Sequence, residues 1–256
     1  MRPRYDDEGG KGVITAQRVA KAAGKHLSRM GLGLRGAIGA RAERRCPACR
    51  TAVPGFFRYG AVREWGCPAC DASPRERLMH HLLDRDVIGV PEGSALLHCA
   101  PNEGSLVDRF RTAAADYVPA DIDPDRYAVP GMQRVDLMAL DADQRFDRIY
   151  ASHVMEHVPD DARVLANIAR ALRPGGEAWL IVPLWDRPTE DGDAAMPPRE
   201  RERRFGQWDH VRQYGADFAD RIAAAGLTVE MVGVRDLSAE DVRLMALDDV
   251  LFRARR

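Results

Sequence analysis

Four cysteines form the pattern in this sequence that points most directly to chemistry. Cys46 and Cys49 make one C-x-x-C pair and Cys67 and Cys70 make another, with 17 residues between the pairs. Two such pairs can place four thiolates tetrahedrally around zinc, and the metal then supplies folding energy to a unit that has little core of its own. We therefore expect a zinc ribbon over residues 44–72. A site closed by four sulfurs is structural, and the alternative is a pair of redox motifs.

The chain after this pattern predicts an α/β sheet. Apolar runs predict strands at 95–99, 116–120, 133–136, 147–151, 177–182, 227–233 and 248–254. Helical periodicity predicts helices at 105–114, 161–172 and 216–225. This alternation is typical of a parallel sheet covered on both faces. Because ligands of such sheets bind beyond the carboxyl ends of the strands, we expect the active site there.

The loop after the first of these strands, HCAPNEG, contains a single glycine, Gly104. A dinucleotide site would favour G-x-G-x-x-G at this place. The loop is therefore either a decayed cofactor loop or a loop for a cofactor that needs fewer glycines.

Several segments resemble class I S-adenosylmethionine-dependent methyltransferases of the type 11-like branch. They are YVPADIDPDRY, RVDLMAL, FDRIYASHVMEHVPDDARVLANIARALRPGGEAWLIVP and DVLFRARR. RERRFGQWDHVRQYG resembles a segment of a bacterial subgroup that joins a cysteine-rich N-terminal unit to this domain. The resemblance implies a Rossmann-like methyltransferase domain over residues 91–256, with a seven-stranded, mostly parallel sheet and S-adenosylmethionine as cofactor.

S-adenosylmethionine carries no phosphate, so a glycine-poor loop with the small Ala100 and the rigid Pro101 is compatible with it. Asp121 ends the second strand, where a carboxylate can accept both ribose hydroxyls, and Asp123 is the reserve candidate. The alternative is that these are solvated loop acids. The resemblance implies further cofactor contacts: the adenine amino group at Asp136, the ring pocket at Leu137, and contacts at His98, Glu103, Ile122, Ser152 and His153.

Candidate catalytic residues lie in an expected insert at 184–215 and after the fourth strand. We expect His210 to act as a base or hydrogen-bond partner and Arg212 to clamp an anion. His157 is the third candidate, and it would share a helical face with His153, four residues earlier. H-x-x-x-H spacing also suggests a metal, but the sequence shows no third ligand.

Charge is unevenly distributed along a chain whose net charge is -1. Residues 1–50 carry a net charge of about +8 and the remainder about -9. Because these charges nearly cancel, the electrostatic field of the whole molecule does not favour binding to nucleic acid or membrane. We expect a basic, partly disordered or helical tail over 1–43, disordered at 1–12, and a linking helix over 73–90. A membrane-spanning apolar segment and a secretory signal are both absent from the sequence, so we expect a cytoplasmic protein that binds no membrane.

Three functions remain open. The first is methyl transfer to a small molecule or peptide, at an oxygen of a carboxylate or hydroxyl. The second is RNA methylation, in which the ribbon and basic tail bind RNA. ASHVMEHV lacks the Asn/Asp-Pro-Pro-aromatic pattern that resembles base-amine methylases. The third is a non-catalytic zinc-binding protein with a decayed methyltransferase fold. The sequence leaves the oligomeric state open.

Overall fold

The computed structural model describes the backbone of residues 16–193 and 195–256, and side chains from residue 23 onward. The part of the tail expected to be disordered, residues 1–12, lies outside the described residues. The chain forms two compact units, one up to Gly89 together with Gly233–Asp249, and one of Val90–Val232 with Val250–Arg256. The expected boundary at 91 is close to the one observed. Residues 233–249 were expected inside the methyltransferase domain and instead pack with the N-terminal residues.

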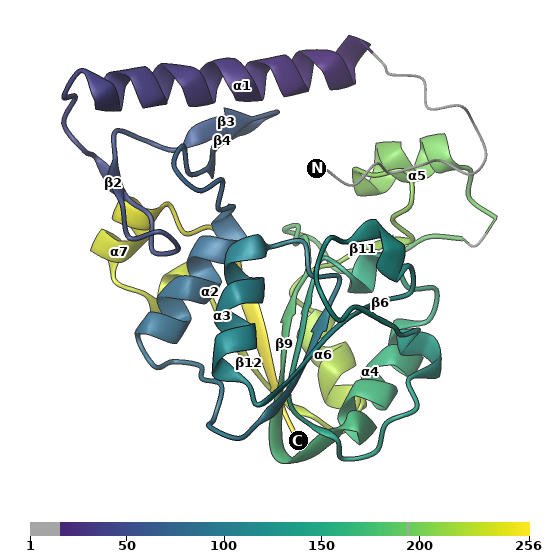
Figure 1. Cartoon of the computed structure of the whole chain (residues 1–256). Helices are drawn as coiled ribbons and strands as arrows, with labels where there is room; N and C mark the ends of the chain where they lie inside the picture. The colour runs from purple at the N-terminus through teal and green to yellow at the C-terminus, as the bar shows by residue number, and fades with distance from the viewer. Residues whose placement is uncertain (1–15, 194) are drawn as a thin grey trace. The chain divides into compact units, whose positions relative to one another are not determined.

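Among the residues that the structure describes, the first unit contains three α-helices, the 3-10 helix η4 (Val234–Asp236) and two small hairpins (Figure 1). Its elements are α1 (Ala16–Ala37), the hairpin of β1 (Arg44–Arg45) and β2 (Ala52–Val53), the hairpin of β3 (Phe57–Tyr59) and β4 (Val62–Gly66), α2 (Pro74–Asp84) and α7 (Ala239–Met245). Ser73 and Glu76 form a capping box at the start of α2, as the Ser-Pro sequence predicts. Ser238 caps α7 by accepting a hydrogen bond from Asp241 N (3.1 Å).

Helix α1 continues through a stretch that contains Gly31, Gly33 and Gly36. Contacts with the second hairpin hold the helix in place. Ser28 Oγ accepts a hydrogen bond from Arg58 N (3.1 Å), and Arg29 Nε donates to the Pro68 carbonyl (3.1 Å). Lys25 Nζ lies 4.5 Å from the centre of the Trp65 ring. Tertiary contacts of this kind override the low helix propensity of glycine.

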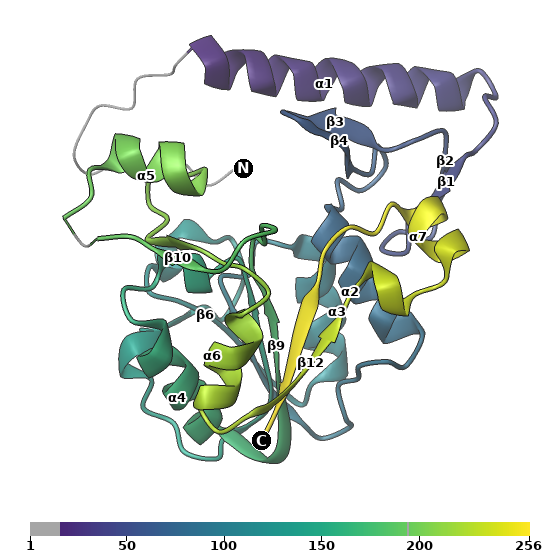
Figure 2. The ribbon, with the colours of Figure 1, turned by 180° about the vertical axis from the view of Figure 1, so that it is seen from behind.

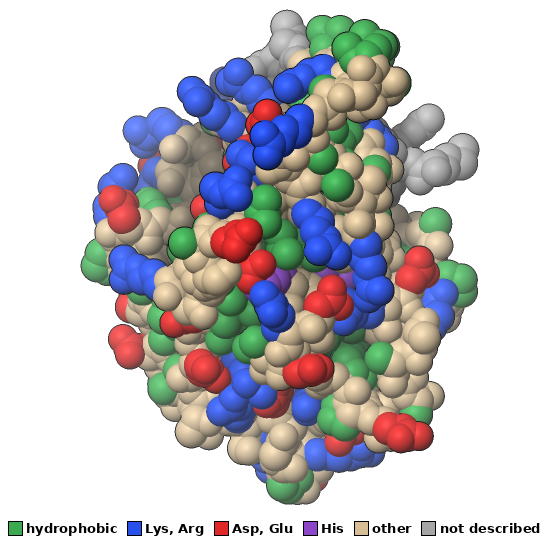
Figure 3. All heavy atoms as spheres, turned by 90° about the vertical axis from the view of Figure 1, so that its left-hand side faces the viewer, with side chains coloured by type: hydrophobic (Ala, Val, Ile, Leu, Met, Phe, Trp, Pro, Cys, Tyr) green, Lys and Arg blue, Asp and Glu red, His purple; other side chains and the backbone are tan. Residues whose placement is uncertain are grey.

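Lys and Arg side chains crowd the upper part of Figure 3, at the level of α1 in Figure 1, where few acidic side chains are seen. Helix α1 itself contains five Lys and Arg residues and no Asp or Glu. Five of the twelve Lys and Arg residues of positions 1–50 therefore lie on this helix.

Arg77 explains why residues 233–249 belong to the first unit. Its side chain is fully buried and donates to backbone carbonyls on both parts of the unit: Glu64, Trp65, Ala72, Met245 and Ala246. A guanidinium has five N–H donors. When it is buried, its donors need hydrogen-bond acceptors, because an unpaired buried donor costs free energy. This single side chain thus connects β4 and α2 with the C-terminal end of α7.

The second unit contains a seven-stranded sheet in the order β12-β13-β9-β8-β5-β6-β7. The strands are β5 (Ala95–Cys99), β6 (Asp116–Asp121), β7 (Gln133–Arg134), β8 (Phe146–Ser152), β9 (Leu172–Ile181), β12 (Thr228–Val232) and β13 (Leu251–Arg255). Strand β13 runs antiparallel to both its neighbours, and the remaining pairs are parallel. The predicted seven-stranded, mostly parallel, Rossmann-like sheet is confirmed.

Helices cover both faces of this sheet, as the alternation of elements predicted. Figures 1 and 2 show α3 (Gly104–Ala113) on one face, and α4 (Asp161–Ala171) and α6 (Phe218–Ala224) on the other. Asp160 caps α4 by accepting from Arg163 N (2.9 Å). Val164, Leu165 and Ile168 are fully buried against the sheet, so the predicted apolar stripe of α4 forms part of the core.

The predicted insert forms a small substructure after β9. It contains β10 (Glu190–Asp191), α5 (Pro198–Phe205) and β11 (Arg212–Gln213), and β10 pairs with β11 (Figure 2). Pro198 begins α5, and Gly206 ends it in a left-handed conformation, as is common at helix ends. A bridge between Leu184 and Tyr214 joins the two ends of this segment.

Glu177 in β9 accepts hydrogen bonds from the side chains of Trp179, Arg253 and Arg255. Trp179 Nε1 and Arg253 Nε each donate to Glu177 Oε2 (both 2.9 Å), and Arg253 Nη2 donates to Glu177 Oε1 (2.6 Å). Burial by itself raises the pKa of Glu177, but the hydrogen bonds from Arg253 and Trp179 outweigh it and hold the pKa below its usual 4.5. This stabilisation is present at neutral pH and is lost as the pH falls through the folded-state pKa.

We expect Glu177→Gln to lower the free energy of unfolding by roughly 1–2 kcal/mol at neutral pH, because neutral hydrogen bonds replace charged ones. Urea denaturation at pH 7 and pH 4 measures this. The difference between wild type and variant should shrink at pH 4, and an equal difference at both pH values would contradict the role given to the charge.

Candidate active site and metal centre

The carboxyl ends of three parallel strands meet at one edge of the sheet. Cys99 on β5 lies opposite Ala120 on β6 and Ala151 on β8. Ala100, Asp121 and Ser152 are therefore adjacent at this edge, although more than 20 residues separate each from the next. Parallel α/β sheets bind their ligands here, so the structure brings three predicted cofactor residues to the expected place.

Two residues at this edge adopt a left-handed backbone conformation without being glycine. Ala100 has φ 49° and His153 has φ 54°. Each is held by a backbone hydrogen bond, Ala100 N to the Ala120 carbonyl (2.9 Å) and His153 N to the Ile181 carbonyl (2.8 Å). Strained conformations of this kind concentrate at functional sites, so both loops show a sign of function that the sequence does not contain.

His98 lies beneath the first loop with no exposed surface. Its Nδ1 is 2.9 Å from the Tyr117 hydroxyl, and its ring packs against Phe110 and Tyr150. Burial lowers the pKa of His98, despite a nearby carboxylate at Glu103. His98 is thus a core residue instead of the direct cofactor contact that the sequence predicted. Glu103, itself buried, lies next to it at the start of α3.

The second loop presents a fixed carboxylate and an exposed apolar side chain. Asp121 accepts hydrogen bonds from Asp123 N and from the Tyr127 hydroxyl, both at 2.8 Å. Each carboxylate oxygen has a second lone pair, so Asp121 can still accept the two ribose hydroxyls. Ile122 is 59% exposed, which is unusual for isoleucine. The Asp123 side chain is less firmly held than that of Asp121. It is half exposed, and its Oδ2 lies 3.9 Å from Arg126 Nε.

The third strand end carries Asp136 and Leu137. Asp136 Oδ1 accepts from Met138 N (2.8 Å) and caps the 3-10 helix η2 (Leu137–Ala139). Leu137 is buried in the core, and its carbonyl accepts from Asn167. The backbone here is well fixed, and the exposed carboxylate of Asp136 keeps an oxygen for a ligand.

After β8 the chain forms the short 3-10 helix η3 (Met155–His157). Ser152 Oγ is buried and has no hydrogen-bond partner among the residues that the structure describes. His153 precedes η3 and lies 3.4 Å from Glu156 (Nδ1 to Oε1). His153 and His157 were expected to share a helical face. The positive φ of His153 separates them, and His157 is directed to other residues.

His157 meets the insert. Its Nδ1 lies 3.4 Å from Asp209 Oδ2, and its ring is 4.8 Å from the ring of His210 in an edge-on arrangement. Burial alone lowers the pKa of His157, but the hydrogen bond to Asp209 outweighs burial and raises it. The same bond lowers the pKa of Asp209 to about 2 against the effect of burial. Burial, and then the nearby charge of His157, lower the pKa of His210.

Two of the predicted catalytic residues, His157 and His210, are thus brought together from positions 53 residues apart. Glu156 lies with them, and Glu156, His157 and His210 each offer a ligand atom within 4.8 Å of the others. Asp209 is a further polar residue of the site that sequence reasoning missed. Its place beside His210 in QWDHVR was visible, but its pairing with His157 was not.

Arg212 does not fit the predicted role of an anion clamp. Its side chain is 5% exposed and donates to the carbonyls of Met155, Val158 and Pro159 and to Asp191. Four acceptors leave no pair of N–H groups for a carboxylate. Arg212 instead fastens β11 to η3, together with Val211 N, which donates to the Glu156 carbonyl (2.8 Å). The prediction of an anion clamp is therefore wrong, and Arg212 is a positioning residue.

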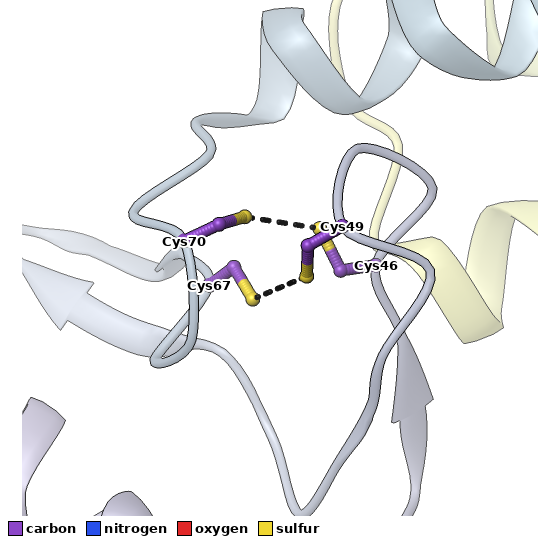
Figure 4. Close-up of side chains that lie close together, drawn as sticks. All are labelled: Cys46, Cys49, Cys67 and Cys70. Carbon is purple, nitrogen blue, oxygen red and sulfur yellow. Dashed lines mark hydrogen bonds between the residues drawn. The ribbon is translucent and has the colours of Figure 1, made fainter. Parts of the chain in front are cut away.

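In the first unit, the four predicted cysteines lie together (Figure 4). Cys46 Sγ is 3.7 Å from Cys70 Sγ, and Cys49 Sγ is 3.8 Å from Cys67 Sγ. All four sulfurs lie within 4.8 Å of one another, and none is in a disulfide. Zinc with four Zn–S bonds of about 2.3 Å requires sulfurs about 3.8 Å apart. The residues present therefore fit a zinc ion, and the two hairpins position one C-x-x-C pair each.

Comparisons with known proteins agree with this fold. A family model described as a methyltransferase domain matches residues 74–230, which is more than half of the chain. The chain belongs to this methyltransferase family, which confirms the resemblance to the S-adenosylmethionine-dependent class. The enzyme is thus a methyltransferase, and its second unit is the methyltransferase fold. A search of curated proteins finds no match.

Solved structures of similar fold are distant in sequence. An S-adenosylmethionine-dependent methyltransferase from Mesorhizobium loti is 17% identical with a TM-score of 0.53, covering 73% of this chain and 100% of that one. A chain of the complex between the Haloferax volcanii Trm112 methyltransferase activator and a methyltransferase is 17% identical, with a TM-score of 0.51 and coverage of 69% and 88%. The N-methyltransferase NodS from Bradyrhizobium japonicum WM9 is 20% identical, with a TM-score of 0.46 and coverage of 73% and 90%.

Proposed function

We propose that the enzyme binds S-adenosylmethionine at the carboxyl edge of the sheet and transfers its methyl group to an oxygen of a small molecule or peptide. The observation that carries this proposal is the meeting of Ala100, Asp121 and Ser152 at one edge, with His157 and His210 beyond it. Membership of a methyltransferase family argues against the non-catalytic alternative.

The cofactor would lie along the ends of β5, β6, β7 and β8. Asp121 would accept the ribose hydroxyls, and the exposed Ile122 would pack against the adenine ring. Asp136 would accept from the adenine amino group, with Leu137 beneath the ring. The methionine end would lie near the first loop (Ala100, Pro101, Glu103) and near Ser152 and His153. The unpaired Ser152 hydroxyl supports this, since a ligand would give it a hydrogen bond.

The transfer is an in-line displacement at the methyl carbon. The bond from sulfur to the methyl carbon breaks, its electron pair stays on sulfur, and the acceptor oxygen forms the new bond. A carboxylate acceptor has no proton to lose, whereas a hydroxyl acceptor must release one. The cofactor supplies the reactive group, and the chain supplies position and orientation.

The acceptor would be held by the polar residues that η3 and the insert bring together. His157 and His210 replace Arg212 as the residues that contact it, because the guanidinium is fully engaged elsewhere. Imidazoles can donate to or accept from an oxygen acceptor. The first unit would contribute a structural zinc at Cys46, Cys49, Cys67 and Cys70, where the sulfur spacing supports the metal.

RNA remains a second candidate acceptor because of one observation, the concentration of basic residues on α1. Such a helix favours a polyanion through counterion release, which makes binding sensitive to salt.

Among the helices that the structure describes, none has the length and apolar character needed to cross a bilayer.

Methyl transfer from labelled S-adenosylmethionine tests the proposal. The purified enzyme is incubated with the labelled cofactor and with fractionated cell extract, and the labelled product is identified by mass spectrometry. We expect a small molecule or peptide labelled on oxygen, with a carboxyl ester recognised by its lability to base. A product labelled on nitrogen would contradict the oxygen assignment alone, and a label released by ribonuclease would establish RNA as the acceptor. An Asp121→Ala sample serves as the control for background labelling.

A further inference from the structure

A cluster of ligand-type side chains in the second unit has the composition of a second metal centre. Glu156 and His157 come from η3, and His210 comes from the insert. Their ligand atoms lie within 4.8 Å of one another. Glu156 and His210 are buried and His157 is partly exposed. We propose that these three residues bind a divalent zinc ion, distinct from the zinc of the four cysteines.

The spacing is close to that of a loaded site. Ligands at about 2.1 Å from a tetrahedral metal lie roughly 3.4 Å apart. Atoms already held within 4.8 Å need only small side-chain rotations to reach that spacing. The hydrogen bond from Val211 N to the Glu156 carbonyl (2.8 Å) and the bonds of Arg212 to η3 keep the two segments together.

The other ring nitrogen of each histidine has the kind of partner that metal-binding histidines have. His157 Nδ1 faces the carboxylate of Asp209 at 3.4 Å, and His210 Nδ1 lies 3.0 Å from the Phe205 carbonyl. Ligating histidines generally donate one ring N–H to a carboxylate or backbone carbonyl, which orients the other nitrogen towards the metal. Both rings have such a partner at Nδ1, so the two Nε2 atoms are the ligand atoms we assign.

Charge and ligand type favour a dication of the zinc class. Glu156 and Asp209 together supply two negative charges around two imidazoles. Two histidines and one glutamate form a known catalytic zinc ligand set, which leaves a coordination position open. The four-cysteine site, in contrast, has no open coordination position. With the metal bound, an acceptor hydroxyl would occupy the open position in place of direct hydrogen bonds to the two imidazoles, because a bound metal lowers the pKa of a coordinated oxygen and its proton can pass to solvent. This consequence for the acceptor rests on the proposed function, whereas the metal site itself does not.

Cobalt binding tests the site without any methyl donor. The protein is first dialysed against a mild chelator that leaves the four-cysteine zinc in place, as metal analysis confirms. Cobalt is then titrated and followed by visible absorption, and zinc binding is followed by calorimetry. We expect one further equivalent with d–d bands of a nitrogen and oxygen site and no thiolate charge-transfer band. The absence of a further equivalent would overturn the proposal, as would a new thiolate band.

Variants assign the ligands. His210→Ala and the near-isosteric Glu156→Gln should each weaken cobalt binding at least about 100-fold. Asp209→Asn should weaken it by about 10–100-fold, because Asp209 orients the His157 ring and does not bind the metal itself. His26→Ala, on the exposed side of α1, should have no effect. Circular dichroism and thermal unfolding show whether each variant is folded. Unchanged binding in folded His210→Ala or Glu156→Gln would overturn the ligand assignment.

The same samples separate this inference from the proposed function. S-adenosylmethionine affinity is measured by calorimetry on the metal-free and cobalt-loaded protein. Cobalt binding without cofactor binding supports the metal site and contradicts the proposed function. Cofactor binding and methyl transfer with no second metal contradict the metal site and leave the proposed function standing.

Discussion

Replacing Cys67 with serine is expected to remove the zinc of the first unit and to unfold that unit. Structural zinc contributes about 10–16 kcal/mol of binding free energy to small metal-dependent folds, whereas the apolar cluster around the cysteines contains only Cys46, Val53, Phe56, Cys67 and Ala72. Tightly bound zinc should fall from about one equivalent to nearly none, measured by metal analysis after dialysis. Limited proteolysis should then cleave residues 40–72 far faster than in the wild type.

Cys99→Ala is the matched control for this experiment. Cys99 is buried on β5 in the second unit, and burial raises the pKa of its thiol to about 12, so it is not a thiolate. Its removal should leave the zinc content unchanged. A wild-type protein that is folded without metal, or that contains a disulfide between Cys46 and Cys49, would contradict the zinc site and favour the redox alternative.

Asp121→Ala is expected to weaken S-adenosylmethionine binding by about 10–150-fold, because two charged hydrogen bonds to the ribose are worth about 1.5–3 kcal/mol in total. Isothermal titration calorimetry with S-adenosylmethionine, and with its demethylated product, measures the affinity. Loss of the carboxylate removes the acceptor that the end of β6 presents, while the sheet remains intact. Thermal unfolding of the variant confirms that the fold is retained.

Two controls separate ribose contacts from a loosened loop. Tyr127→Phe removes the hydroxyl that donates to Asp121 but keeps the carboxylate, and we expect its affinity to change less than about threefold, as for one neutral hydrogen bond. Asp125→Ala removes a side chain that is almost fully exposed and should have no effect. If Asp123→Ala causes the large loss and Asp121→Ala does not, the ribose contact belongs to Asp123.

The local elements of the chain could be predicted from the sequence, because each depends on residues that lie close together along the chain. C-x-x-C spacing determines that each cysteine pair can turn towards one metal. Apolar runs and helical periodicity determine where strands and helices form, as for β5, β8 and α4. Since parallel strands end at the same edge, the positions of Ala100, Asp121 and Ser152 followed from the strand ends alone.

The long-range pairings could not be predicted in this way. Helix α1 extends through glycines because the second hairpin holds it, and residues 233–249 join the first unit because Arg77 binds their carbonyls. His98 and Arg212 are types that serve at active sites, yet burial turns one into a core residue and the other into a connector. No local sequence pattern indicates which hydrogen-bond acceptors such a side chain will contact in the folded chain.

The sequence by itself determined the class of fold, the four-cysteine cluster and the edge of the sheet where we propose that the cofactor binds, because each depends on residue type and short spacing. The tertiary structure alone decided that His157, Asp209 and His210 meet, and that Glu156 lies with them. These residues come from segments about 50 positions apart. Their contact depends on how the insert folds back over η3, which is set by the buried hydrogen bonds of Arg212 and Val211 and not by any spacing along the chain.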